Sequence, residues 1–149
     1  MHAVQRWLSS KHRSRQETAG SRSLLRTECR AQALAAVGPG FFFSYAEDAE
    51  EGLKILKDTT KAIPDVIFLD INLPLMSGWQ CLTQLKRDVS LRDIPVIMYS
   101  TSTHQRDKEI AKDLGAVCLI SKPHDYQDMI KLLQVIVADA KAGTLNAYP

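Results

Sequence analysis

The sequence is poor in cysteine and has no long apolar run, and both shortages narrow the class of protein. Its three cysteines are widely spaced and form no CxxC pair, so neither a disulfide framework nor a zinc site is indicated. No apolar stretch reaches the roughly 18 to 20 residues that a membrane-spanning helix requires. We therefore expect a protein of the reducing cytoplasm that does not enter a membrane.

The chain is also short. Its 149 residues, of which 45% are hydrophobic, suffice for one globular domain with a sizeable core but not for a second. No DNA-binding domain is therefore expected. Any output must come from contacts made by the surface of this one domain.

Charge is unevenly spread, although the net charge is only +2. Residues 1–30 hold seven basic and two acidic residues, a net charge of +5, which leaves −3 for the remainder. We expect an atypical, disordered basic segment over residues 1–23, a compact domain over 24–140 and a frayed tail over 141–149. Binding of nucleic acid or another polyanion is the alternative for the basic segment.

From residue 41 onward, apolar strand-like runs alternate with amphipathic stretches, which is typical of a parallel sheet covered by helices on both faces. The predicted strands are Phe41–Ala46, Val66–Asp70, Ile94–Tyr99 and Ala116–Ile120. Capping patterns and apolar stripes predict helices over about Asp48–Thr60, Ser77–Asp88, Thr103–Leu114 and Asp125–Asp139.

Three of these strands end in polar residues that can do chemistry. Asp70, Ser100 and Lys122 follow successive strands, and in an open parallel sheet ligands bind outside the carboxyl ends of the strands. A carboxylate nucleophile, a hydroxyl donor and an ammonium that offsets negative charge form a sensible phosphoryl site. His104 and His124 lie in loop or helix-start positions and are assigned no role.

Three motifs in order resemble the receiver domains of two-component response regulators. Asp70–Gly78 resembles the phosphoacceptor loop, with proline four and glycine eight residues after the aspartate. Ile94–Thr101 resembles the fourth strand of the family, and Lys122-Pro123 its lysine and following proline. The resemblance implies an α/β, flavodoxin-like, doubly wound sheet of strand order 2-1-3-4-5.

The same resemblance implies a function and a set of roles. Asp70 would accept a phosphoryl group from a histidine kinase or phosphotransfer protein, with Mg²⁺ held by Asp70 and the backbone carbonyl of Asn72. Pro123 would follow a cis peptide bond, and Pro74 and Gly78 would shape the loop. A downstream protein partner would detect the change around the fourth helix, while formation of a homodimer is left open.

The N-terminus departs from the receiver pattern. Counting back from Ala33–Pro39, which resembles the end of the first helix, puts Gly20–Ser23 where receivers carry two metal-binding acids. No first strand is identifiable: Gln16–Ser23 is poor in β-branched residues, and His2–Leu8 fills the gap only weakly. Either the N-terminus has diverged, or an altered reading frame or start has replaced it. We favour the second explanation as a hypothesis.

Two further departures define the alternatives. Leu119 stands three residues before the lysine, where many receivers carry a switching aromatic, so a switch here must use other packing. The missing acids favour a non-phosphorylated, receiver-like interaction module as the second hypothesis. A phosphohydrolase that forms an aspartyl phosphate would need Asp-x-Asp, but the third residue is Asn72. The protein is therefore expected to be a signalling domain and not an enzyme acting on other substrates.

Overall fold

The computed structural model describes residues 5–9, 42–46, 48–101, 104–123 and 125–145. Its elements, in chain order, are β1 (Gln5–Ser9), β2 (Phe42–Ala46), α2 (Ala49–Lys57), β3 (Val66–Asp70), α3 (Gly78–Arg87), β4 (Val96–Ser100), α4 (Gln105–Asp113), β5 (Cys118–Ser121) and α5 (Tyr126–Ala142). Within these residues, no helix combines the length and apolar character that crossing a bilayer demands.

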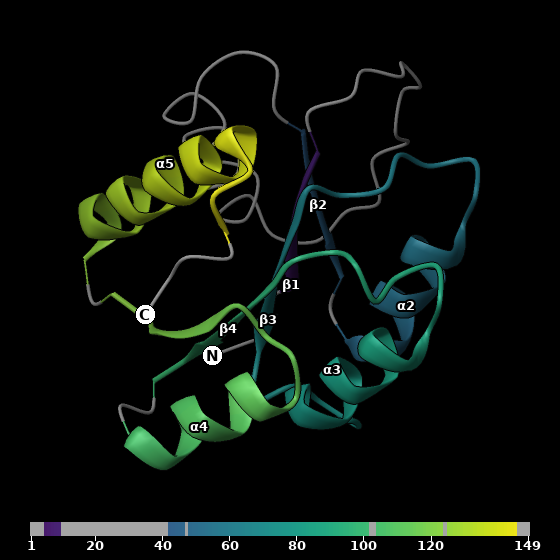
Figure 1. The fold of residues 1–149 in the computed structure, drawn as a ribbon, viewed down its shortest axis with the longest axis horizontal. Coiled ribbons are helices and arrows are strands. Elements are labelled where there is room, and N and C mark those ends of the chain that lie inside the picture. Colours follow the sequence, from purple (N-terminus) through teal and green to yellow (C-terminus); the bar gives the residue numbers. More distant parts are fainter. Residues whose placement is uncertain (1–4, 10–41, 47, 102–103, 124, 146–149) are drawn as a thin grey trace.

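The five strands form one sheet of order β2-β1-β3-β4-β5 (Figure 1). This confirms the predicted flavodoxin-like order 2-1-3-4-5. Strands β3, β4 and β5 pair in parallel, with Asp70 opposite Tyr99 and Ser100 opposite Ser121. The carboxyl ends of these three strands therefore lie at one edge of the sheet.

Strand β1 occupies the place of the first strand, which was not identifiable in the sequence, and its direction differs from the one expected. It overlaps the weak candidate His2–Leu8, and it pairs antiparallel with both β2 and β3. Arg6 lies opposite Phe68 and Leu8 opposite Val66, so β1 begins beside the carboxyl end of β3 and ends beside its start. The sequence pattern could not fix this, because alternation of side chains is the same in either strand direction.

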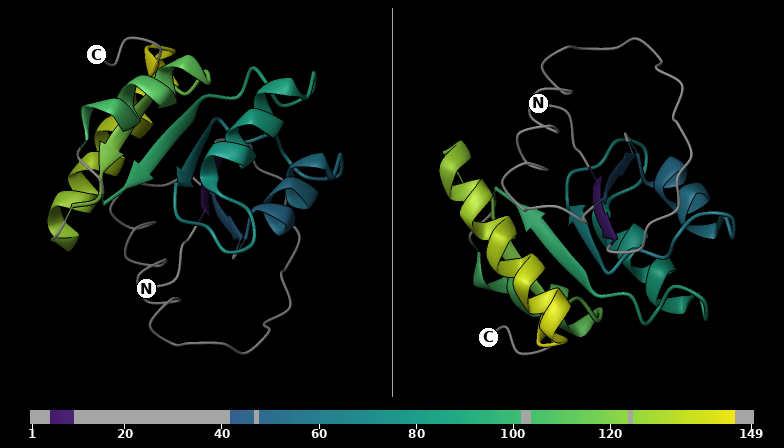
Figure 2. Two further views of the ribbon diagram at one scale, coloured as in Figure 1. Left: turned by 90° about the horizontal axis from the view of Figure 1, so that it is seen from below. Right: turned by 90° about the horizontal axis from the view of Figure 1, so that it is seen from above.

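Alternate residues of β3 and β4 feed two separate cores, as the period of two in a strand requires. Ile67, Leu69 and Met98 pack with α2, α3 and α4 on one face. On the other face, the cluster with α5 consists of Val66, Phe68, Ile97, Leu133, Ile136, Val137 and Leu145. Figure 2 shows α5 across the strands from α2 and α3.

The helix starts follow the predicted caps. Asp48 accepts a hydrogen bond from the Glu51 N–H at 2.8 Å, Ser77 and Gln80 form a capping box, and Asp125 accepts from the Gln127 N–H. Helix α5 continues to Ala142, beyond the predicted end at Asp139. It stops where Gly143 adopts φ 70°, a conformation that glycine takes at little cost.

The start of α4 differs slightly from its prediction. His104 is the N-cap residue, with no side-chain capping hydrogen bond, and the helix begins at Gln105. The predicted start at Thr103 lies outside the described residues, as do Gly20–Ser23 and His124.

Candidate functional site

The three predicted site residues occupy adjacent strand ends. Asp70 closes β3, Ser100 closes β4, and Lys122 follows β5 directly. The carboxylate and the hydroxyl are both deeply buried, with exposures of 2% and 1%, whereas the Lys122 side chain keeps 29% of its surface exposed. A buried acid and an ammonium that reaches it from the surface therefore share one edge of the sheet.

Both carboxylate oxygens of Asp70 are engaged. Oδ2 contacts the ammonium of Lys122 in an ion pair, and Oδ1 accepts a hydrogen bond from the backbone N–H of Asn72 at 2.9 Å. A carboxylate this buried needs such partners, because an uncompensated charge in a protein interior is costly. The pair fixes where a nucleophilic oxygen would lie.

Lys122 is held from strand β4 as well. Its backbone N–H donates to the carbonyl of Ser100 at 2.7 Å, and its Nζ lies 5.2 Å from the centroid of the Tyr99 ring. This distance is within the range of a cation–π contact. Tyr99 was not among the predicted site residues; an aromatic residue directly before the strand-end hydroxyl was the signal that could have found it.

Gly78 closes the loop after Asp70. Its N–H donates to the carbonyl of Ile71 at 2.9 Å, and a Cβ added to Gly78 would lie 2.1 Å from the carbonyl oxygen of Asp70. No side chain fits at that distance. A glycine here therefore lets α3 begin against the end of β3.

Leu75, which was not among the predicted site residues, lies in the same loop. It has φ 66°, which non-glycine residues seldom adopt, and its side chain is 94% exposed. Pro74 precedes it, and the carbonyl of Pro74 accepts from the N–H of Met76 at 2.7 Å. The tight turn is thus built at the cost of backbone strain in the loop that follows Asp70.

The prediction of a cis bond before Pro123 is wrong. The described residues contain no cis peptide bond, so Lys122-Pro123 is trans. The trans form of an X–Pro bond is ordinarily the more stable by about 0.5–1 kcal/mol. Here the Lys122 ammonium reaches Asp70 without the cis form.

The described residues do not provide the ligand set expected for Mg²⁺. Among them, no three His, Cys, Asp or Glu side chains gather to hold a metal, although Mg²⁺ prefers several oxygen ligands in octahedral geometry. Asp70 and the carbonyl of Asn72 are the predicted ligands, and the Asp70 oxygens already bind Lys122 and the Asn72 N–H. Because β1 is reversed, its carboxyl end at Ser9 lies away from Asp70.

Curated proteins that are similar to this chain differ in how much of their length the match covers. PilH of Pseudomonas aeruginosa is 31% identical over 93 residues, which are 62% of this chain and 74% of PilH. A protein-glutamate methylesterase/protein-glutamine glutaminase of Methanosarcina mazei is 34% identical over 94 residues, but the match covers only 26% of that longer protein. The match therefore spans most of PilH but about a quarter of the methylesterase.

Solved structures give the same result. The crystal structure of the phosphorylated cyanobacterial phytochrome response regulator RcpA matches 79% of this chain and 87% of its own, with a TM-score of 0.69 and 26% identity. The Mn²⁺-bound form of response regulator Rcp1 matches 68% of this chain and 73% of its own, with a TM-score of 0.54 and 25% identity.

The family model described as the response regulator receiver domain matches residues 28–134, which include Asp70, Ser100 and Lys122. This range is more than half of the chain and contains β2 to β5 with the edge of the sheet described above. The chain therefore belongs to the response regulator receiver domain family.

Proposed function

We propose that this receiver is a cytoplasmic signalling domain that accepts a phosphoryl group on Asp70 from a phosphohistidine of a histidine kinase or phosphotransfer protein. The observation that carries the proposal is the contact of the buried Asp70 carboxylate with the Lys122 ammonium at the carboxyl edge of the sheet. An oxygen of Asp70 would attack phosphorus while the P–N bond to the imidazole breaks, leaving an acyl phosphate. No other substrate is proposed.

Lys122 and Ser100 would stabilise the product. A phosphoryl group brings about −1.5 to −2 charges and three strong acceptor oxygens. The Lys122 ammonium, already at the carboxylate, would offset that charge. The Ser100 hydroxyl, at the end of the adjacent strand, would donate to a phosphoryl oxygen.

The output would be a change in protein–protein contacts around α4. This helix buries Ala111 alone and presents a polar surface to solvent. It begins a few residues after Ser100, so movement of Ser100 toward a phosphoryl group would be felt at its start. A downstream protein partner that detects this surface is the simplest outlet, and a second copy of the chain is the other.

A non-phosphorylated interaction module is the second candidate. The reversed direction of β1 and the single carboxylate at the described site favour it. In such a module, Asp70 and Lys122 would remain paired, and binding to a partner would not depend on phosphoryl transfer.

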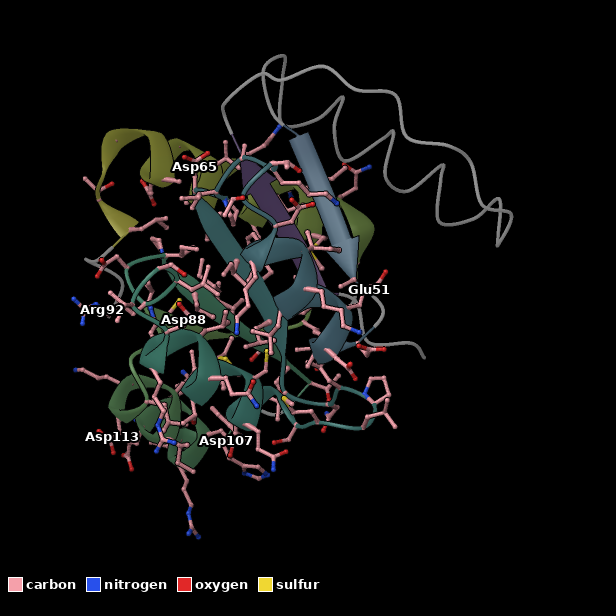
Figure 3. The ribbon with its side chains drawn as sticks, turned by 90° about the vertical axis from the view of Figure 1, so that its right-hand side faces the viewer. Glu51, Asp65, Asp88, Arg92, Asp107 and Asp113 are labelled. Atoms are coloured by element: carbon pink, nitrogen blue, oxygen red, sulfur yellow. The ribbon has the colours of Figure 1, made fainter. Side chains whose placement is uncertain are left out.

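Intact-mass measurement after incubation with acetyl phosphate and Mg²⁺ separates the two candidates. Phosphoryl transfer predicts a mass increase of one phosphoryl group in the full chain and none in Asp70→Asn. Asp65→Asn is the matched control, since Asp65 lies at the other end of β3 (Figure 3), and it should behave as the unmodified chain. No added phosphoryl group in the folded, unmodified chain would defeat the first proposal and leave the interaction module.

A further inference from the structure

Tyr99 lies between the site and helix α5. It is opposite Asp70 in the sheet and precedes Ser100. Ile97, two residues earlier on the same face of β4, packs in the cluster that contains Leu133 and Ile136 of α5. The Tyr99 hydroxyl donates to the sulfur of Met129 on α5 at 3.2 Å.

The ring of Tyr99 contacts the ammonium of the Asp70–Lys122 ion pair. The Lys122 ammonium lies 5.2 Å from the ring centroid and also contacts Asp70 Oδ2. The ammonium thus has two partners of different kind, a carboxylate and the face of an aromatic ring. One continuous set of contacts runs from Asp70 through Lys122 and Tyr99 to Met129.

Leu119 does not take part in this set. It is buried in the cluster on the opposite face of the sheet, with Ala111 of α4 and Met98. A leucine has neither a hydroxyl nor a polarised ring, so it cannot respond to a nearby cation as a tyrosine does. The aromatic residue that meets the site here therefore comes from β4 and faces α5.

We infer that Tyr99 is a positioning residue that holds the Lys122 ammonium at Asp70 and transmits a change of charge at Asp70 to Met129 on α5. Where phosphorylation is the change of charge at Asp70, the inference rests on the proposed function. An ammonium drawn to phosphoryl oxygens leaves its place over the ring, and the ring and its hydroxyl then settle differently against Met129. The N-terminal half of α5 becomes a second surface at which the state of Asp70 is detected.

The test that does not need phosphorylation uses methyl-labelled methionine and nuclear magnetic resonance of the full chain. Asp70→Asn and Lys122→Met each disrupt the ion pair, and each should shift the Met129 methyl signal, which is assigned with Met129→Leu. Met98 is the internal control, because it lies on the opposite face of β4 in the other core. Its signal should move less and should report that the variants remain folded.

Tyr99 variants show whether the shift travels through this side chain. Tyr99→Leu should abolish the response of Met129 to Asp70→Asn, and Tyr99→Phe, which lacks only the hydroxyl, should reduce it. Ile97→Val alters packing on the same face without touching the ion pair and should preserve the response. A Met129 signal that ignores both Asp70→Asn and Lys122→Met, or a response unchanged in Tyr99→Leu, overturns the inference.

The acetyl phosphate assay adds a functional readout. Tyr99→Leu should slow phosphorylation of Asp70 about two- to fivefold, the factor that corresponds to a cation–π contact at a partly exposed site. Ile97→Val should not. If neither the unmodified chain nor any variant gains a phosphoryl group while the Met129 response persists, the proposed function fails and the coupling stands. If phosphorylation occurs without the Met129 response, the coupling fails and the proposed function stands.

Discussion

The two halves of the sheet differ in whether their strands pair in parallel or antiparallel. In the parallel half, made of β3, β4 and β5, Asp70, Ser100 and Lys122 lie at one edge of the sheet, as the topology of an open sheet predicts, and Lys122 contacts Asp70. In the reversed half, made of β1 and β2, β1 runs against both of its neighbours. The parallel strands alone therefore bring Asp70 and Lys122 together, and this contact does not depend on the direction of β1.

Leu8→Pro is expected to have the largest effect, because β1 has a partner on both sides and proline cannot donate to either. The proline variant lacks the backbone N–H of residue 8, and a carbonyl of a neighbouring strand loses its hydrogen-bond partner. The free energy of unfolding should therefore fall by roughly 2–4 kcal/mol. Urea denaturation measures this change. Leu8→Val keeps the N–H and is the matched control. Equal stability of the proline and valine variants would show that the reversed half does not depend on β1.

Gly78→Ala tests the parallel half at the close approach to Asp70. Its Cβ would meet the Asp70 carbonyl oxygen at 2.1 Å, so α3 must move, at a cost of roughly 2–3 kcal/mol in unfolding free energy. Gly143→Ala is the control, since there the space is open and only φ 70° opposes alanine, at about 1 kcal/mol. A Gly78 variant that loses no more stability than the Gly143 variant would contradict the tight packing of the loop.

Leu75→Asn should act in the opposite direction. Asparagine tolerates positive φ better than leucine does, and the exposed Leu75 side chain has little packing to lose. We expect a gain of about 1 kcal/mol in thermal or urea denaturation. Val89→Asn, which also replaces an exposed apolar side chain, is the control and should change stability little. A loss of stability in Leu75→Asn alone would show that the leucine makes contacts that its exposure does not suggest.

The smallest effects on stability are expected from two aspartates that end α2 and α3. Asp58 and Asp88 each accept hydrogen bonds from the hydroxyl and the backbone N–H of the residue two positions on, Thr60 and Ser90, and these bonds lower the pKa of each carboxyl from its ordinary value. A carboxyl with a lowered folded pKa gives stability above its unfolded pKa, and this stability is lost as the pH falls through the folded value.

Asp88→Asn should therefore lower the free energy of unfolding near neutral pH, where the carboxylate contributes, and should flatten the loss of stability as the pH falls, so that the variant and the unmodified chain converge in acid. Asp58→Asn should do the same, but to a smaller degree, because Asp88 also pairs with Lys57 at 3.5 Å. Acid titration followed by circular dichroism measures both. Identical titration curves for the variants and the unmodified chain would exclude the two carboxyls as contributors.

Much of the parallel half could be predicted because its signals are local. The caps Asp48 and Ser77 and the apolar strand before Asp70 are written in neighbouring residues. Convergence of Asp70 and Lys122 needed only the rule that parallel strands end at one edge. Tyr99 was missed because its contacts join β4 to Lys122 and Met129, which lie far from it in the chain.

The reversed half could not be predicted in the same way. A pattern of five residues does not determine the direction of a strand. Side chains alternate between the two faces of the sheet in either direction, and the backbone groups pair in both. For this reason the region of β1 was only a weak candidate for the first strand, as His2–Leu8. The trans bond at Pro123 was likewise missed, because a bond isomer depends on how the surrounding chain is held rather than on the dipeptide.

The central place of β1 has a consequence for the order in which the molecule can assemble. β2 and β3 do not touch except through it, and its partners in β3 are far along the chain, with Leu8 opposite Val66. Closing so long a loop is slow, whereas β3, β4 and β5 are joined by shorter connections. Strands β3, β4 and β5 are therefore expected to form first, and until β1 inserts, β2 and β3 each expose an unpaired edge that another chain could join.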